Sequence, residues 1–338
     1  MKIIIPMAGE GSRLRPHTLN TPKPLISIAG KSILKRLLEN LSQSIPMKEI
    51  IFIIRNLEKK IENKLINIAN NMGLDGTIYY QEKPLGTADA LLKAKNSLKG
   101  PVFVAFSDTL YYNDNLFLKN EFNNNIIWTK KVKNPSLFGI VKCDPSTGFI
   151  THFIEKPKNF VSNLAIIGLY YFKNSSLLKK ELQYILDHDI KNEKEYQLTS
   201  ALENMRKKGE RFVVKQVQEW MDFGNKKSTI SSNSKILSIE HNNNKLELIH
   251  KESIIKNSLI IKPCFIGKKT IIENCIIGPY VSIGQYTKIK NSKIEKSLIQ
   301  NYTEIIHANI SNSMIGNYTS YIGREKEVSL GDYSKFFF

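Results

Sequence analysis

The sequence predicts an α/β domain with a mostly parallel sheet, followed by a parallel β-helix. Short apolar segments of strand length alternate with amphipathic segments of helical length over residues 3–106. A glycine-containing loop follows the first apolar segment, at the sheet edge where parallel α/β sheets bind ligands. From residue 254 onward isoleucines recur in steps of six or five residues, which is the pattern of a hexapeptide-repeat solenoid.

The alternation gives the order of elements in the first part of the chain. Buried strands are expected at residues 3–5, 50–54, 77–80 and 102–106. Helices are expected at residues 32–41, 58–72 and 88–98. Strands and helices at this spacing form βαβ units, and the connections of such units make neighbouring strands parallel.

The loop after the first strand, Pro6–Pro16, has the composition of a phosphate-binding loop. Gly9 and Gly11 allow backbone N–H groups to approach an anion closely. Arg13 suits forked contacts to phosphate oxygens, and Lys23 adds a compact positive charge. The pattern Gly-x-Gly-x-Arg-x-Arg-Pro, followed by Pro-Lys-Pro-Leu, is more specific than a flexible glycine turn with solvated basic residues.

Two common phosphate-binding motifs are excluded by spacing. A dinucleotide fingerprint needs a glycine where Leu14 stands. The segment Gly30-Lys31-Ser32 resembles the end of a P-loop, but the first glycine of that motif would fall on Leu25.

The loop resembles the signature of the sugar-1-phosphate nucleotidylyltransferases, the family of glucose-1-phosphate thymidylyl- and uridylyltransferases. The resemblance implies a Rossmann-like nucleotidyltransferase domain and nucleotide contacts from Ala8, Gly9, Gly11 and Ser12. It also implies catalytic roles for three basic residues, namely Arg13, Lys23 and Lys156.

The segment Gln81–Ala90 resembles the base-recognition loop of that family. By resemblance, the Gln81 side chain and the Gly86 backbone contact the base. A glutamine amide offers both a donor and an acceptor, which suits a pyrimidine edge. A helix start capped by Thr87 remains the alternative.

Two aspartates are implied as ligands of one Mg²⁺. Asp108 follows the strand at residues 102–106, and Asp222 lies in the segment Trp220–Asn225, which resembles a second metal motif. Ser107 and Asn225 depart from the residues usual in the family. A helix cap is the alternative for Asp108.

Three segments match the sugar-phosphate half of the family site in order: 138–141, 154–157 and 163–172. By resemblance, Gly139 lets a sugar ring approach the backbone and Glu155 accepts hydrogen bonds from sugar hydroxyls. Lys156 holds the sugar phosphate, and Ile166 belongs to the third segment. An exposed Glu155–Lys156 ion pair is the alternative. Residues 195–202 are expected to start an amphipathic helix without chemistry of its own.

The expected domains are a catalytic domain at residues 1–230, a polar and partly helical connector at 231–250, a β-helix at 251–331 and a tail at 332–338. The recurring isoleucines are expected to form one buried column; they are Ile254, Ile260, Ile266, Ile272, Ile277, Ile283, Ile289, Ile294, Ile299, Ile305, Ile310 and Ile315. By resemblance the solenoid is left-handed and mediates a homo-oligomer. The tail ends in Phe336–Phe338, which is expected either to dock on a neighbouring surface or to fray.

Composition limits the class of partner. The chain has 338 residues and a formal net charge of +18, which suggests an anionic partner. The lysines are scattered and no nucleic-acid-binding module is present, so nucleotides are favoured over nucleic acid. Three cysteines without a CxxC pattern argue against zinc and disulfides. Without a signal peptide or an apolar stretch of about 18 residues, no membrane partner and a cytoplasmic location are expected.

The expected reaction is nucleotidyl transfer from dTTP (or UTP) to a sugar 1-phosphate, first of all glucose 1-phosphate, with Mg²⁺. Two alternatives remain open. In a bifunctional uridylyltransferase/acyltransferase the β-helix carries the second activity, for which His307 is the histidine at hand. A non-catalytic nucleotide-sugar-binding regulator is expected to lack a metal aspartate or the signature arginine, whereas Arg13, Lys23, Asp108 and Asp222 are present.

Overall fold

The computed structural model describes residues 1–57, 59–112, 123–243 and 248–323. The chain divides into two compact units: Met1–Ile26 with Ser32–Gly224, and Ser27–Lys31 with Asn225–Phe338. The domain boundaries expected from the sequence, after residues 230, 250 and 331, stay predictions. The tail that ends in Phe336–Phe338 lies outside the described residues. No helix in the described ranges is long and apolar enough to cross a membrane.

The first unit is built on a nine-stranded mixed sheet. Its strands are β1 (Lys2–Pro6), β4 (Glu49–Ile54), β5 (Asp75–Tyr80), β6 (Val102–Ala105), β8 (Asn125–Lys131), β9 (Gly139–Cys143), β10 (Ile150–Glu155), β11 (Leu164–Phe172) and β12 (Phe212–Gln216). The order is β10-β9-β11-β6-β1-β4-β5, and β8 pairs with both β11 and β12. The strands β6, β1, β4 and β5 are parallel, which confirms the α/β fold. From β11 to β10 the pairing is antiparallel.

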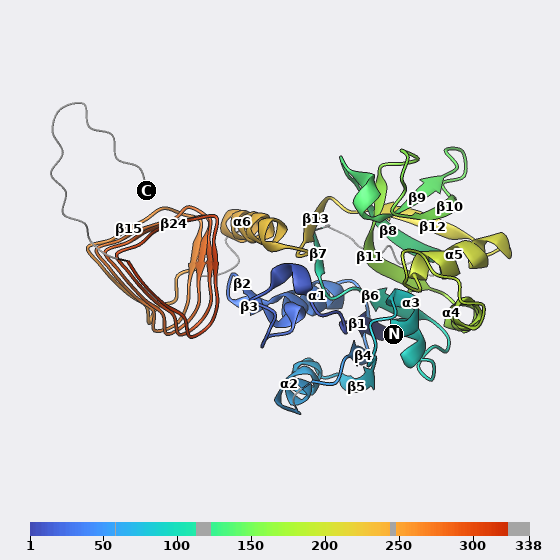
Figure 1. Ribbon diagram of the computed structural model, residues 1–338, viewed down its shortest axis with the longest axis horizontal. Helices are drawn as coiled ribbons and strands as arrows, with labels where there is room; N and C mark the ends of the chain where they lie inside the picture. The colour runs from blue at the N-terminus through green and yellow to red at the C-terminus, as the bar shows by residue number, and fades with distance from the viewer. Residues whose placement is uncertain (58, 113–122, 244–247, 324–338) are drawn as a thin grey trace. The chain divides into compact units, whose positions relative to one another are not determined.

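Five helices accompany this sheet in the described residues: α1 (Ile33–Ser42), α2 (Lys59–Asn70), α3 (Thr87–Lys93), α4 (Ser175–Asp187) and α5 (Leu198–Lys207). Three short 3₁₀ helices are η1 (Ser12–Leu14), η2 (Lys23–Leu25) and η3 (Pro135–Leu137). Helices α3, α4 and α5 pack against one another (Figure 1). The strands β1, β4, β5 and β6 and the helices α1, α2 and α3 lie where the sequence predicts them, although α3 ends at Lys93 rather than at residue 98.

Local chemistry accounts for the start of α1. The Ser32 side chain accepts a hydrogen bond from the Lys35 N–H, which satisfies a donor at the helix start. The apolar face behind it, including Ile33 and Leu37, is fully buried. Helix α1 therefore owes its position to the same periodicity that predicts it.

A two-stranded antiparallel ribbon in the first unit joins β7 (Thr109–Tyr112) and β13 (Glu219–Asp222). Asp222 lies opposite Thr109, and the Phe223 N–H donates to the Asp108 carbonyl at 3.3 Å. The ribbon thus brings Asp222 beside Asp108, which lies between β6 and β7, although the two are far apart in the sequence.

The second unit contains a parallel β-helix, as predicted. Its coils stack as a three-sided prism in Figure 1, with one sheet on each side. The strands are β14 (Ile254–Lys256), β15 (Leu259–Ile260), β16 (Cys264–Ile266), β17 (Ile271–Glu273), β18 (Ile276–Ile277), β19 (Val281–Ile283), β20 (Lys288–Lys290), β21 (Lys293–Glu295), β22 (Leu298–Ile299), β23 (Glu304–Ile306), β24 (Asn309–Ser311), β25 (Met314–Ile315) and β26 (Ser320–Ile322).

The predicted isoleucine column fills the centre of this prism, with one exception. Residues from Ile266 to Ile310 in the predicted series are buried, and Ile260 and Ile315 pack against them at the two ends. Ile254 does not belong to the column, because its side chain is 47% exposed. Its neighbour Ile255 packs against the core instead. Successive side chains of a strand point to opposite faces, so only one of the two can face inward.

The second unit also includes the hairpin residues 27–31, from β2 (Ser27–Ile28) and β3 (Lys31–Ser32), and helix α6 (Lys226–Asn242). The sequence suggests only a partly helical connector here, whereas α6 runs without a break. Asn225 and Ser228 form a reciprocal capping box at its start. Asn233 is fully buried, and its Oδ1 accepts a hydrogen bond from Ser282 Oγ at 2.6 Å. The inner face of α6 is thus partly polar.

Candidate active site

A cavity of about 410 Å³ opens in the first unit where the loops after β1, β5 and β6 meet. Nine of the site residues predicted from the sequence line it: Ala8, Gly9, Gly11, Ser12, Arg13, Lys23, Gln81, Gly86 and Asp108. The loops lie at the carboxyl ends of parallel strands, so the topology itself collects them at one edge.

The signature loop leaves β1 and turns into η1 at Gly11. Gly11 has φ 63°, in the left-handed region that favours glycine. A methyl group on it would lie 3.0 Å from Thr18 Cγ2 and 3.3 Å from Lys23 Cβ. Thr18 Oγ1 donates to the Gly11 carbonyl at 2.9 Å. The turn is therefore packed from behind, and its front faces the cavity.

Arg13 lies next to the end of the β7–β13 ribbon. A methyl group on Gly224 would come within 3.0 Å of Asp222 Oδ2 and 3.5 Å of Arg13 Nη2. Gly224 lines the cavity, and its N–H donates to Asp222 Oδ1 at 3.0 Å. Asp222, which does not itself line the cavity, is thereby held at its edge.

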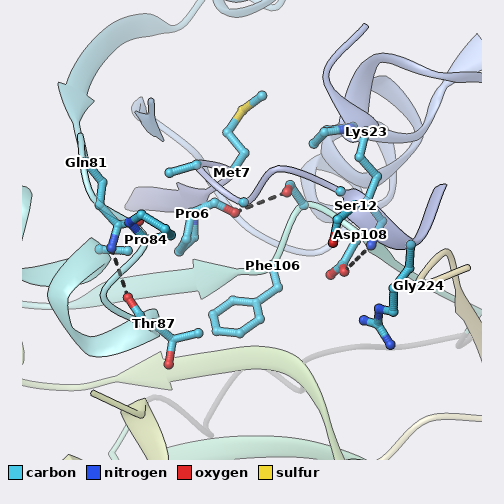
Figure 2. A pocket seen from close by; sticks show the side chains of 18 of the residues that line it. Pro6, Met7, Ser12, Lys23, Gln81, Pro84, Thr87, Phe106, Asp108 and Gly224 are labelled. Carbon is cyan, nitrogen blue, oxygen red and sulfur yellow. Dashed lines mark hydrogen bonds and ion pairs between the residues drawn. The ribbon is translucent and has the colours of Figure 1, made fainter. Parts of the chain in front are cut away.

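Lys23 and Asp108 form an ion pair of 2.6 Å (Figure 2). Asp108 keeps 38% of its side chain exposed, so it remains accessible to a ligand. Ser107 fixes the turn before it, because Ser107 Oγ donates to the Pro6 carbonyl at 3.1 Å and so joins the ends of β6 and β1.

The two aspartates fit a magnesium ion. Carboxylate oxygens are ligands that Mg²⁺ prefers, and this ion is commonly held by one or two carboxylates, with substrate phosphates and water completing the shell. Within the described ranges no group of three or more His, Cys, Asp or Glu side chains could hold a metal. Asp108 and Asp222 lie on neighbouring segments and offer carboxylate oxygens, and the phosphates of a nucleotide would supply further oxygen ligands.

Gln81 lies among the loops around α3, away from Lys23 in the view of Figure 2. Its Nε2 donates to the Gly86 carbonyl at 3.0 Å and to Asp89 Oδ2 at 2.8 Å. Asp89 is almost fully buried and pairs with Lys93 at 3.0 Å. Asp89 is not among the site residues predicted from the sequence, although it lies within the segment Gln81–Ala90 that resembles the base-recognition loop.

The loop containing Gly86 is joined to the segment before α5. Gly86 has φ 114°, and a methyl group on it would lie 2.7 Å from the Tyr196 nitrogen. The Tyr196 N–H donates to the Leu85 carbonyl at 2.8 Å. Thr87 does not cap α3 with its side chain; its Oγ1 accepts from the Leu198 N–H at the start of α5, at 2.9 Å.

The predicted sugar-phosphate residues form a second cluster that does not line the cavity. A methyl group on Gly139 would meet Glu155 Oε2 at 2.9 Å, Thr199 Cγ2 at 3.0 Å and Ile166 Cδ1 at 3.6 Å. Thr199 Oγ1 donates to Glu155 Oε2 at 2.9 Å. Thr199 is not among the predicted site residues, because the sequence predicts only the start of a helix at residues 195–202. Gly139 leaves the Glu155 carboxylate uncovered on this side.

Burial raises the pKa of Glu155, while the hydrogen bond from Thr199 and the charge of Lys156 oppose that rise. Lys156 pairs with Glu193 at 3.0 Å, and this bond raises the pKa of the lysine. The Lys156 ammonium is therefore charged, adjacent to Glu155, and paired with the exposed carboxylate of Glu193.

Tyr170 connects the two clusters. Burial raises the pKa of its hydroxyl, and the nearby carboxylates of Glu155 and Asp108 add to that rise. Its ring lies 5.6 Å from that of Phe106, which lines the cavity together with Glu195. The Glu155 cluster and the cavity thus belong to one region of the first unit, and Phe106, Tyr170 and Glu195 are parts of it that are not among the site residues predicted from the sequence.

The β-helix places His307 in a ladder of corner residues. Asn274 Nδ2 donates to Asn291 Oδ1 at 3.2 Å, and Asn291 Nδ2 lies 3.5 Å from His307 Nε2. All three have positive φ, between 47° and 54°. His307 therefore occupies a repeated turn position.

Comparisons with known proteins agree with this geometry. The model of the family described as nucleotidyl transferase matches residues 2–239. The mannose-1-phosphate guanylyltransferase catalytic subunit beta of Drosophila pseudoobscura pseudoobscura is 31% identical over 274 residues, which cover 79% of this chain and 71% of that protein. The bifunctional protein GlmU of Methanococcus aeolicus is 31% identical over 272 residues, which cover 78% of this chain but 60% of that protein.

A crystal structure from Bacillus anthracis, named provisionally as a glucose-1-phosphate thymidylyltransferase and solved with a sucrose, matches with a TM-score of 0.60. The match covers 70% of this chain and 94% of that one, at 23% identity, so it shows a common fold. The family model, which spans most of the first unit and every loop of the cavity, goes further than the fold. The chain belongs to the nucleotidyl transferase family.

Proposed function

We propose that this protein transfers a nucleotidyl group from a nucleoside triphosphate to a sugar 1-phosphate and releases pyrophosphate. The observation that carries the proposal is the meeting, in one cavity, of the glycine loop, Arg13, Lys23 and Asp108. The relatives support the sugar 1-phosphate as acceptor, because one is a mannose-1-phosphate guanylyltransferase.

The reaction needs positioning and charge neutralisation. An oxygen of the sugar phosphate attacks the α-phosphorus in line, the bond from this phosphorus to the pyrophosphate breaks, and no protein nucleophile takes part. Arg13 steadies the triphosphate and the leaving pyrophosphate, and Lys23 contacts the phosphates at the reacting centre. Mg²⁺, when held by Asp108 and Asp222, supplies further neutralisation of phosphate charge.

The sugar 1-phosphate is assigned to the second cluster. Lys156 exchanges Glu193 for the sugar phosphate, and Glu155 accepts hydrogen bonds from sugar hydroxyls across Gly139. Glucose 1-phosphate with dTTP or UTP is the first candidate pair. Mannose 1-phosphate with GTP is the second, favoured by the guanylyltransferase relative.

One experiment tests the reaction and the substrates together. Pyrophosphate release is measured with dTTP, UTP, GTP, CTP and ATP against glucose, mannose and N-acetylglucosamine 1-phosphates, with Mg²⁺ present. Release with at least one pair supports the proposal, and the best pair identifies the base and the sugar. Release with none contradicts it.

An acyltransferase activity of the β-helix is a weaker candidate, because His307 occupies a repeated corner position rather than a separate site. Acetyl transfer from acetyl-CoA to glucosamine 1-phosphate would favour it. We also propose a homo-oligomer, since exposed apolar side chains such as Leu259 and Ile276 lie on one side of the first coils. A monomeric mass by light scattering at micromolar concentration would contradict this.

A further inference from the structure

We propose that Asp89 is a positioning residue that sets the base preference of the nucleotide site by fixing the direction of the Gln81 amide. The inference rests on the proposed function, because it treats the cavity as a nucleotide site. It adds a reason why the site prefers one class of base.

Two acceptors fix the amide. Gln81 Nε2 lies 2.8 Å from Asp89 Oδ2 and 3.0 Å from the Gly86 carbonyl. A carboxylate and a carbonyl oxygen only accept hydrogen bonds, so the NH₂ group has to face them. Rotating the amide by half a turn would place Oε1 against both acceptors and lose both bonds. Both Gln81 and Asp89 are almost fully buried, where such a loss is costly.

The fixed amide determines what Gln81 offers a ligand. Both hydrogens of Nε2 are used, and Gln81 lines the cavity, so Oε1 is the atom that this side chain presents to a base. An acceptor at this place selects a base edge with a ring N–H. Thymine and uracil carry N3–H beside a carbonyl, and guanine carries N1–H beside a carbonyl. Cytosine N3 and adenine N1 are acceptors, so in the same placement they oppose Oε1 with a lone pair.

Lys93 provides a matched control. It pairs with the other oxygen of the same carboxylate, Asp89 Oδ1, and its side chain is 40% exposed. Replacing Lys93 removes the ion pair and leaves the Gln81–Asp89 bond in place. Asp89→Asn keeps the size of the side chain but adds a donor, because the introduced amide can either accept from Gln81 Nε2 or donate to Gln81 Oε1. In this variant only the Gly86 carbonyl still opposes the reversed direction of the Gln81 amide, so the orientation of the amide is held more weakly.

The experiment measures base preference in the wild type, Asp89→Asn and Lys93→Met. Equilibrium binding and kcat/KM are determined for the five nucleoside triphosphates, with the sugar 1-phosphate that gives the highest rate. We expect Asp89→Asn to reduce the preference of dTTP, UTP and GTP over CTP and ATP by about tenfold or more, mainly through Kd and KM, with kcat little changed. Lys93→Met is expected to keep the wild-type preference.

Equal preference in Asp89→Asn and the wild type overturns the inference and leaves the proposed function intact. An equal loss in Asp89→Asn and Lys93→Met overturns it too, because the ion pair alone then explains the effect. If no sugar 1-phosphate supports pyrophosphate release, the proposed function fails, and the binding series still tests the inference. Absence of binding by all five nucleotides overturns both.

A second measurement does not depend on the folding of a variant. Methylation of the ring N–H removes the donor that Gln81 Oε1 requires. The wild type is therefore expected to bind 3-methyl-UTP and 1-methyl-GTP about tenfold or more weakly than UTP and GTP. Equal binding of the methylated and parent nucleotides overturns the inference.

Discussion

Lys23 Nζ lies 2.6 Å from Asp108 Oδ2, and both residues line the same cavity. The lysine side chain is 11% exposed, whereas the aspartate is more open. The pair keeps a buried ammonium neutralised in the free protein. Under the proposed function, the negative charge of the triphosphate attracts Lys23 away from Asp108, and the Asp108 carboxylate is then available for a cation.

Asp108→Asn is expected to lower the rate of pyrophosphate release by about 10²–10³-fold, because one well-placed charge is lost from the reacting centre. The rate is measured at saturating substrates with Mg²⁺, and chelation by EDTA should abolish it until Mg²⁺ is restored. Asp75→Asn, at the exposed start of β5, is the control and should retain the wild-type rate. A folded Asp108→Asn variant with near-normal turnover would show that Asp108 has no part in the chemistry.

Arg13→Ala is expected to slow turnover by about 10²–10³-fold, since the proposed role of Arg13 is to provide positive charge at the triphosphate. Arg15→Ala is the matched control two residues away. Arg15 is exposed, pairs with Glu10 at 2.7 Å and does not line the cavity. Single-turnover measurements should separate the two variants, and similar rates for both would refute the role of Arg13.

Glu155 predicts a pH dependence. Burial raises the pKa of Glu155, and hydrogen bonding to sugar hydroxyls needs its carboxylate form. Activity should therefore fall, with decreasing pH, at a higher pH than an ordinary glutamate would give. The measurement is kcat/KM for the sugar 1-phosphate against pH, and Glu155→Gln should retain only the limb due to the substrate phosphate, whose own pKa is about 6.

The same shift affects stability with a definite sign. The folded protein binds the Glu155 proton more tightly than the unfolded chain, so this stabilisation is complete below the ordinary glutamate pKa and is lost as pH rises through the raised value. Unfolding of the wild type and Glu155→Gln at about pH 4 and about pH 8 checks it. The wild type should lose stability relative to the variant at the higher pH, and the opposite trend would contradict the assignment.

Ile276 and Ile277 are neighbours on β18 with opposite environments. Ile277 is fully buried in the core of the β-helix, whereas Ile276 is 41% exposed. Ile277→Ala should destabilise the second unit by about 2–5 kcal/mol, and Ile276→Ala by about 0.5 kcal/mol or less. Hydrogen exchange of residues 271–299 should show loss of protection only for Ile277→Ala. Equal loss in both variants would mean that the column does not stabilise the coils.

Local patterns in the sequence predict those helices, strands and coils whose buried residues recur at a regular spacing. The strand at Ile3–Ile5, the helix beginning at Ile33 and the isoleucine column each repeat the spacing of their element. The cavity loops follow from topology, because parallel strands end at one edge. The prediction that Ile254 belongs to the buried column is wrong. Ile255 has the same side chain, so the sequence of the pair does not determine which of the two faces inward.

Long-range contacts account for what the sequence did not reveal. Helix α6 buries Asn233 against Ser282, so its inner face mixes polar side chains with the apolar ones, which weakens the apolar stripe by which a helix is identified. The contact of Thr199 with Glu155 joins residues 44 positions apart. The direction of the Gln81 amide depends on Asp89, and only three-dimensional contacts determine it.

The hydrogen bonds that join Leu85 and Thr87 to Tyr196 and Leu198 have a thermodynamic consequence for the binding of the two proposed substrates. On one side of these hydrogen bonds lies Gly86, whose carbonyl accepts from Gln81. On the other side, Leu198 is followed by Thr199, which donates to Glu155. Under the proposed function, we expect a nucleotide that restricts residues 85–88 to restrict residues 196–199 as well, so that the second substrate loses less conformational entropy on arrival. Reciprocity then requires the sugar phosphate to tighten nucleotide binding by the same factor, which makes the two substrates heterotropic activators of each other.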